Sequence, residues 1–194
     1  MNRSAVVANP DTRQRILDAA IRCVQGFGIE KTSMNDIARE AGVTRPTVYH
    51  YFGNRDEVVQ AALLQSGYGF AERVKKHIQR YPTAEERLVE ALMYAYRKLP
   101  AEPYLELVTK GNISQMVNET ALTSAEGQAI CLDIFAAIFE GRDDLAADMA
   151  EIIEFSTRLL LSFLIIEGPV KRSDRQLRDL LRRRLLPALG MSLA

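Results

Sequence analysis

The feature of the sequence that most restricts its fold is the spacing of three residues within the segment 34–52. Ala38 is small, Gly42 follows it by four residues, and Val48 follows the glycine by six. Two helices can cross closely at a small residue, and glycine tolerates the positive φ of a tight turn. An apolar residue after the turn packs back into the angle between the helices. This spacing therefore predicts a helix-turn-helix unit.

Capping residues on both sides of the turn support this prediction. Ser33 precedes the first helix and Asp36 stands three residues later, where its carboxylate can complete a capping box. Thr44 precedes the second helix, which we expect to end near Tyr51. Each helix is therefore short and begins at a side chain that satisfies its first free N–H groups.

An amphipathic helix is predicted ahead of this unit. Asp11 can cap its start, and Gly26 and Gly28 end it. Its apolar residues recur every three or four positions, so we expect them to face a common core. They are Ile16, Ala20, Cys23 and Phe27. Residues 1–9 precede this helix and are expected to be disordered.

Helical periodicity continues through the rest of the sequence, and signals for β-strands are nearly absent. A long helix is expected from about residue 55 to 80, and prolines interrupt the pattern after it. Further helices are expected near 84–98, 103–118, 123–140, 144–167 and 173–188. We therefore predict an all-α fold with two domains, residues 1–54 and 55–194.

The domains differ in charge, although the whole chain is neutral, with 25 basic and 25 acidic residues. Residues 1–55 carry 8 basic and 5 acidic groups, residues 56–170 carry 10 and 18, and residues 171–194 carry 7 and 2. A basic first domain attached to an acidic one is typical of a DNA-binding domain joined to another domain. Unevenly distributed solvated side chains would give the same totals, so charge alone leaves both interpretations open.

The second helix of the unit carries side chains suited to DNA. Val48 and Phe52 are expected to face the core, which leaves the other side chains of this helix in solvent. The N-terminal end of such a helix reaches base edges in the major groove. Arg45 can donate two hydrogen bonds to guanine, and Thr47 suits a phosphate or a thymine methyl group. His50 can equally be an ordinary surface histidine.

Other side chains around the unit suit the DNA backbone. Tyr49 and Tyr51 can donate phenolic hydrogen bonds to phosphates, although Tyr51 can equally belong to the core. Thr32 and Ser33 lie at the start of a helix, where free N–H groups and the helix dipole favour an anion. Arg55, or Asn54 beside it, can contact a phosphate at the start of the following helix.

These residues lie within a stretch, 16–59, that resembles the N-terminal domain of the TetR/AcrR family of transcriptional regulators. The matching pieces are ILDAA, TSMNDIA, AGV and TVYHYF. The family usually has Lys in F-x-x-K-x-x-L after this domain, whereas this chain has FGNRDEV. Arg55 keeps the positive charge of that lysine but has a different donor geometry.

The resemblance implies a homodimeric repressor. Its N-terminal three-helix domain would bind DNA, and its C-terminal helical domain would hold a small effector and form the dimer. In the family, the third helix and the starts of the second and fourth contact DNA. The residues of this sequence that take this role are Thr32, Ser33, Arg45, Pro46, Thr47, Tyr49, His50, Tyr51 and Arg55.

Two sets of apolar residues are candidates for the roles of the second domain. The helices near 144–167 and 173–188 are strongly apolar and could form a four-helix dimer interface, although they could also close a monomer's core. The interface candidates are Phe155, Leu159, Phe163, Leu177, Leu181 and Leu185. The effector-pocket candidates are Phe70, Met93, Tyr94, Tyr104, Met116, Phe135 and Phe139, each of which could be ordinary core. The acidic charge of 56–170 suggests a cationic effector, but solvated faces explain it as well.

Several classes of function are disfavoured by what the sequence lacks. It has no Ser-His-Asp set, metal-ligand spacing or phosphate-binding loop, so we expect neither an enzyme nor a bound metal or cofactor. His77 lies in the charged segment RVKKHIQR and is expected to be solvated. A helical protein-interaction module without DNA binding, and a DNA-bound activator, remain as alternatives to a repressor.

The expected compartment follows from the thiols and the apolar runs. Cys23 and Cys131 are far apart in the sequence, and two free thiols fit a reducing environment. The apolar run 159–166 is far shorter than the roughly 20 residues that span a bilayer. No signal peptide is apparent at the N-terminus. We therefore expect a cytoplasmic protein without a membrane partner.

Overall fold

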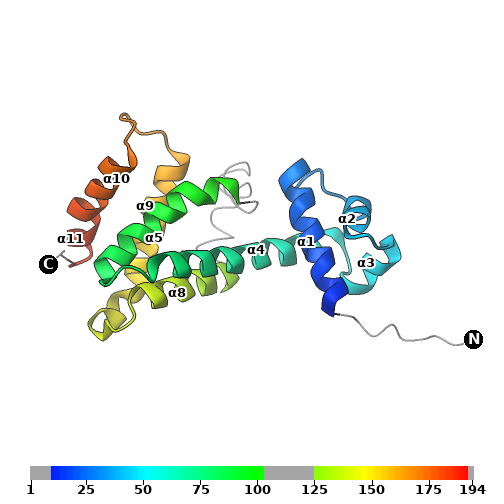
Figure 1. Ribbon diagram of the computed structural model, residues 1–194, viewed down its shortest axis with the longest axis horizontal. Coiled ribbons are helices and arrows are strands. Elements are labelled where there is room, and N and C mark those ends of the chain that lie inside the picture. The colour runs from blue at the N-terminus through cyan, green and yellow to red at the C-terminus, as the bar shows by residue number, and fades with distance from the viewer. Residues whose placement is uncertain (1–9, 103–124, 192–194) are drawn as a thin grey trace, which may run out of the picture. The chain divides into compact units, whose positions relative to one another are not determined.

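The computed structural model describes residues 10–102 and 125–191. The disorder expected for 1–9 and the helix expected at 103–118 lie outside the described residues. Every regular element within the described ranges is a helix, as Figure 1 shows. The prediction of an all-α fold is therefore confirmed.

The chain divides into two compact units. The described residues of the first, which we call the head, are 10–67 and 102, and those of the second are 68–101 and 125–191. The division falls inside one continuous helix, α4 (Arg55–Ile78). The boundary between residues 54 and 55 coincides with the start of α4, and its role as a domain boundary stays a prediction.

The head consists of three helices and the beginning of α4. The helices are α1 (Pro10–Phe27), α2 (Met34–Ala41) and α3 (Arg45–Tyr51). They share one core, whose fully buried residues include Ile16, Ala20, Ile37, Val48 and Val58. The expectation that Phe27 faces this core is wrong, because its side chain is 53% exposed. The helix ends at this residue and the chain turns away at Gly28, with φ 81°.

The second unit is built around α5. Its described elements after α4 are α5 (Ala84–Lys98), the 3-10 turn η1 (Leu99–Ala101), α8 (Ala125–Ile138), the 3-10 segment η2 (Asp143–Asp148), α9 (Met149–Ile165), α10 (Asp174–Leu180), the π-helical turn η3 (Leu181–Leu185) and α11 (Leu186–Ala188). The helix α5 packs against α8, α9 and α10. The helix expected at 144–167 is therefore divided into η2 and α9. The helix expected at 173–188 is interrupted by η3.

Ion pairs join α5 to α10. Glu90 is only 6% exposed, and its carboxylate accepts two hydrogen bonds from the Arg178 guanidinium, one of them at 3.1 Å. These hydrogen bonds raise the pKa of Arg178 above its ordinary value. Arg97 forms a second pair with Asp174 at the surface. Because Glu90 is nearly buried, its charge depends on Arg178 for compensation.

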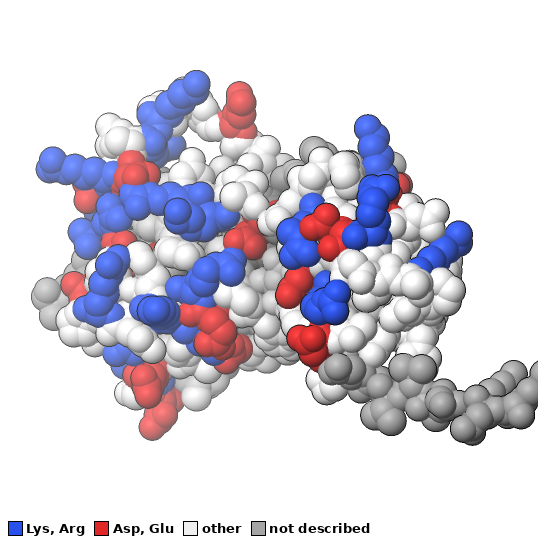
Figure 2. All heavy atoms as spheres, turned by 45° about the vertical axis from the view of Figure 1, so that its right-hand side comes forward, with Lys and Arg blue, Asp and Glu red and all other residues white. Residues whose placement is uncertain are grey.

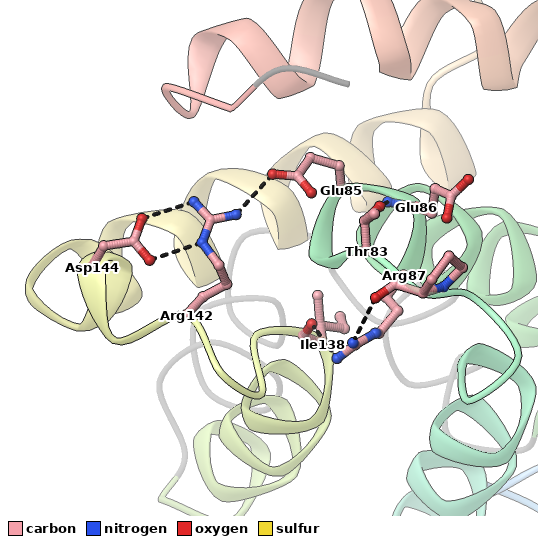
Figure 3. Close-up of polar contacts among 8 residues, drawn as sticks. Thr83, Glu85, Glu86, Arg87, Ile138, Arg142 and Asp144 are labelled. Atoms are coloured by element: carbon pink, nitrogen blue, oxygen red, sulfur yellow. Dashed lines mark hydrogen bonds and ion pairs between the residues drawn. The ribbon is translucent and has the colours of Figure 1, made fainter. Parts of the chain in front are cut away.

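Two further arginines hold the loops near the start of α5, which Figure 3 shows in close-up. Arg142 forms hydrogen bonds of 2.8 Å with both Glu85 and Asp144. Arg87 donates to backbone carbonyls at the end of α8, including that of Ile138 at 3.3 Å, and to the Pro82 carbonyl at 3.0 Å. These contacts fix the ends of α8 and α4 against α5.

Candidate nucleic-acid interface

The turn between α2 and α3 has the geometry that its spacing predicts. Gly42 has φ 64° and ψ 36°, the left-handed conformation that favours glycine. Its N–H donates to the Arg39 carbonyl at 3.2 Å, and Arg15 of α1 donates to the Ala41 carbonyl at 2.7 Å. A Cβ at Gly42 would lie 3.3 Å from the Arg15 guanidinium. Sequence reasoning missed the role of Arg15, for which no local pattern gives a signal.

Both helices begin at the expected caps. The Ser33 hydroxyl accepts the Asp36 N–H at 3.2 Å, and the Asp36 carboxylate accepts the Ser33 N–H at 3.3 Å, which confirms the capping box. The hydrogen bond from the Ser33 hydroxyl is the main cause that lowers the pKa of Asp36 below its ordinary value. At α3, the Thr44 hydroxyl accepts the Thr47 N–H at 3.3 Å. These caps fix where α2 and α3 start.

The orientation of α3 follows from its two inward residues. Val48 and Phe52 are buried in the core of the head, as predicted. Most side chains proposed for DNA contact therefore lie outside. Those of Ser33, Arg45, Pro46, Tyr49 and His50 are exposed, whereas those of Thr47 and Tyr51 are half-buried.

The structure corrects the expectation for Thr32. Its side chain is 2% exposed, and its hydroxyl donates to the Gly28 carbonyl at 2.8 Å. Its backbone N–H donates to the Ile29 carbonyl at 3.3 Å. Because both donors are used inside the turn before α2, Thr32 does not present them to a phosphate. It stabilises the turn that carries Ser33.

Arg55 also differs from its expected role. Its Nε donates to the Thr32 carbonyl at 2.8 Å, its Nη2 donates to the Ile29 carbonyl, and its Nη1 pairs with Asp56 at 2.7 Å. The guanidinium at the start of α4 therefore holds the turn that precedes α2. This contact joins residues more than twenty positions apart, so no local pattern predicts it.

The charges around the head are mixed. Arg22 pairs with Glu40 at 2.6 Å and Arg39 pairs with Asp36 at 2.7 Å. Figure 2 shows Asp and Glu side chains among the Lys and Arg side chains on the face drawn. Within the described part of the chain, no carboxylate lies within ion-pair distance of Arg45. Among the described residues, the positive charge of Arg45 is therefore not neutralised by an ion pair.

The exposed side chains of α2 and α3 offer hydrogen-bond donors and a positive charge. Among the residues that the structure describes, no group of three or more His, Cys, Asp or Glu side chains could hold a metal ion. No helix within residues 10–102 and 125–191 has the length and apolar character needed to cross a bilayer. Phosphate oxygens and base-edge acceptors are the groups that such a donor surface can bind.

A sequence comparison places α1, α2, α3 and the start of α4 in a known family. The family described as "Bacterial regulatory proteins, tetR family" matches residues 16–62. Residues 16–62 form a domain of the TetR family. The match covers the helix-turn-helix unit and its capping residues, which are the features on which the sequence resemblance depends.

Curated relatives support the same assignment. The HTH-type transcriptional regulator TtgR of Pseudomonas putida is 34% identical over 109 residues, 56% of this chain and 48% of that protein. The fatty acid metabolism regulator protein of Bacillus subtilis (strain 168) is 28% identical over 101 residues, 52% of each chain. The alignments span about half the length of these TetR-family relatives. Both are regulators, and the family is not one of enzymes.

Solved structures share the fold over nearly the whole chain. The TetR family repressor AlkX of Dietzia sp. strain DQ12-45-1b has a TM-score of 0.65 at 23% identity, covering 94% of this chain and 96% of AlkX. GusR of Salmonella enterica has a TM-score of 0.65 at 19% identity, covering 95% and 98%. At this identity the similarity shows that the fold, including the second unit, is that of TetR-family structures.

The proposed effector-pocket residues lie mostly in the core of the second unit. Phe70, Met93, Phe135 and Phe139 are buried and Tyr94 is half-buried, whereas Tyr104 and Met116 lie outside the described residues. The ring of Tyr94 lies 5.9 Å from that of Phe70 and 4.7 Å from that of His77. The structure therefore brings three kinds of ring, an apolar ring, a phenol and an imidazole, into one cluster.

His77 is not solvated as its charged neighbours suggest. Its side chain is half-buried against Tyr81 and Tyr94. This burial, followed by the positive charge of Arg80, lowers the pKa of His77 below its ordinary value. A charged sequence around a helical residue does not show which face that residue occupies, and this explains the error.

An open groove of about 660 Å³ lies elsewhere in the second unit, between α4 and α8. Its lining includes Glu72, Lys75, Lys76, Arg87 and Glu140, and none of the proposed pocket residues that the structure describes. Lys75 forms ion pairs with Glu72 at 2.6 Å and with Asp133 at 2.7 Å. The groove is therefore lined mainly by charged side chains, of which Lys75 and Glu72 compensate each other.

The proposed dimer residues divide into two groups. Leu177, Leu181 and Leu185 are buried inside the second unit, because α10 and η3 pack their leucine stripe inward. For these three residues the interface expectation is corrected to a core position. On α9, by contrast, Phe155 is 48% exposed, and Leu159 and Phe163 are half-buried.

Proposed function

We propose that this TetR-family chain is a DNA-binding transcriptional regulator, and specifically a homodimeric repressor that a small molecule releases from a palindromic operator in the cytoplasm. The observation that carries the proposal is the arrangement of α3. Val48 is buried in the core while Arg45 and Tyr49 on the same short helix are exposed. A helix anchored in this way can place its outer side chains in the major groove.

The exposed residues divide between two kinds of contact. Arg45 and Pro46, at the N-terminal end of α3, are placed to meet base edges, whereas Ser33, at the start of α2, is placed to meet a phosphate. Tyr49 and His50 lie one turn further along α3. Because Thr32 and Arg55 are engaged inside the head, we do not assign them direct contacts; they position α2.

The proposed dimer rests on apolar surface left open on α8 and α9. Leu132 of α8 is 52% exposed, and α8 packs beside α9, which carries the exposed Phe155. Exposed apolar side chains on adjacent helices mark an interface with another protein surface. A second copy of the chain would cover them with the same helices, as a two-fold interface requires. Two heads related in this way would meet half-sites about 34–36 Å apart.

The proposed response to an effector depends on the continuity of α4. One part of this helix belongs to the head and the other to the second unit. A small molecule that displaces the cluster of Phe70, His77 and Tyr94 would displace α4, because Phe70 and His77 lie on it. Coupling between the two sites then lowers the affinity for DNA. The aromatic cluster favours a mainly apolar effector with one hydrogen-bonding group.

Selection of bound sequences from random duplex DNA tests this function directly. We expect the full-length protein to select an inverted repeat, and R45A to weaken binding to it. R175A removes an exposed arginine of α10, outside the head, and serves as the matched control. A transcriptional reporter then separates a repressor from an activator. Absence of any selected sequence would favour the alternative of a protein-interaction module.

A further inference from the structure

The exposed side chains of α3 include one pair that touch each other. Arg45 and Tyr49 are separated by one helical turn. The Nη2 of Arg45 donates to the Oη of Tyr49 at 3.2 Å. The Cζ of Arg45 lies 5.3 Å from the centroid of the Tyr49 ring, within cation–π distance. The guanidinium is therefore held by both the face and the hydroxyl of one tyrosine.

This contact does not serve the core of the head. Arg45 is exposed and Tyr49 is 42% exposed, so neither side chain fills space between helices. The core contacts of α3 are supplied by Val48, which is buried, and by Tyr51, which is partly buried against the core. The other ring contact on α3 is separate, since His50 packs edge-on against Tyr51 at 5.3 Å. The pair of Arg45 and Tyr49 therefore organises only the outer surface of α3.

The direction of the hydrogen bond decides what the pair can bind. A guanidinium can only donate, so the Tyr49 oxygen is the acceptor in this contact. The hydroxyl hydrogen of Tyr49 is then not needed for the pair and can donate elsewhere. The remaining N–H groups of Arg45 can also donate. The pair thus presents mainly donors, whereas the major-groove edge of guanine and a phosphate oxygen present acceptors alone.

A free arginine side chain adopts many rotamers, and binding has to select one of them. A guanidinium already held against a ring has lost part of that freedom before it meets DNA, which favours association. We propose that Tyr49 is a positioning residue for Arg45, and that discrimination for guanine belongs to the pair and not to Arg45 alone. This inference rests on the proposed DNA-binding function. It goes further by naming the two residues that together determine specificity for guanine.

A double-mutant cycle on the full-length protein tests the inference. R45A, Y49A and R45A/Y49A are compared with the unsubstituted chain on its selected duplex, and on duplexes in which each G·C pair is replaced. The base pair that Arg45 reads is the one whose replacement weakens binding by the unsubstituted chain but does not weaken binding by R45A. At this position we expect Y49A to reduce discrimination by about fivefold or more.

Two further variants separate the ring from the hydroxyl and supply a control. Y49F keeps the ring face but loses Oη, so its discrimination should lie between that of the unsubstituted chain and that of Y49A. H50A removes another exposed ring of α3 that packs on Tyr51. The loss of discrimination in R45A/H50A should therefore equal the product of the two single losses. The loss in R45A/Y49A should be smaller than the product of its two single losses.

Three results would overturn the inference. The first is a loss of discrimination in R45A/Y49A equal to the product of the two single losses, and the second is unchanged discrimination in Y49A. The third is tighter DNA binding by Y49A, which would mean that the ring shields Arg45. Each of these results leaves the proposed DNA-binding function intact, because the experiment can be done only after the protein has selected a duplex. If the unsubstituted chain selects no sequence, both proposals fail. Because both side chains are exposed, thermal unfolding of each variant should match that of the unsubstituted chain.

Discussion

The head and the second unit differ in how far apart in the sequence their polar contacts reach. In the head, Arg15 reaches a carbonyl 26 residues away and Gln65 reaches a carboxylate 47 residues away. In the second unit, the pairs of Arg97 with Asp174 and of Arg178 with Glu90 join residues 77 and 88 positions apart. The head is therefore organised by nearby parts of the chain, whereas the second unit depends on the return of its last helices to α5.

The surfaces of the two units differ as well. On α3, apolar residues point inward and polar residues point outward. On α9, by contrast, Phe155 remains open and Leu159 is only half-buried. A unit that leaves such side chains in water is expected to need a partner. The comparison supports the proposals that the head reads DNA and that the second unit forms the dimer, and each proposal can be tested separately.

The largest expected effect concerns the buried ion pair of the second unit. Arg178→Met leaves the Glu90 carboxylate without its partner, and removing one member of a buried pair costs about 3–5 kcal/mol of unfolding free energy. E90M/R178M should recover much of this loss because no charge is left uncompensated. Urea denaturation of both variants measures the difference. Equal destabilisation of both would show that shape, and not charge, holds α10 to α5.

The next effect concerns the open face of α9. Phe155→Glu places a charge in the proposed interface, and we expect the dimer to dissociate about 30-fold more readily. Analytical ultracentrifugation over a range of concentrations measures this change. F27E, at an exposed phenylalanine of the head, should leave the dimer unchanged. A dimer that tolerates F155E would place the interface on another surface.

A smaller effect is expected for the turn before α2. Arg55→Ala removes the donors that bind the carbonyls of Ile29 and Thr32. Hydrogen bonds from a charged group contribute about 1.5–3 kcal/mol each, and partial exposure of Arg55 reduces this to about 2 kcal/mol in total. Hydrogen exchange of the amides of α2 should accelerate while that of α5 does not. If the two helices respond equally, Arg55 does not act locally in the head.

The smallest effect is a pH dependence of the capping box. The pKa of Asp36 lies below its ordinary value of 3.8, first because of the Ser33 hydroxyl. Its stabilising effect is therefore complete above pH 3.8 and is lost as the pH falls through the folded-state pKa. Asp36→Asn should lower the thermal midpoint at neutral pH, and the difference should shrink in acid. A difference that is independent of pH would exclude ionisation of Asp36 as its cause.

The sequence by itself determined the helix-turn-helix unit. Ser33, Asp36, Gly42 and Val48 lie within sixteen residues of one another, and caps, a left-handed turn and an apolar contact are each satisfied by groups close along the chain. This is why the boundaries of α2 and α3 and the outward direction of Arg45 could be predicted before the fold was known.

Only the tertiary structure decided the partners of residues that lie far apart in the sequence. An apolar stripe shows that a helix is buried but not which helix covers it, so Leu177 and Phe155 looked equivalent and proved to differ. A polar side chain likewise shows what it can bind but not what is near, so Arg55 was expected on a phosphate and holds a carbonyl. Such choices depend on which groups folding brings together, and the local sequence does not contain that information.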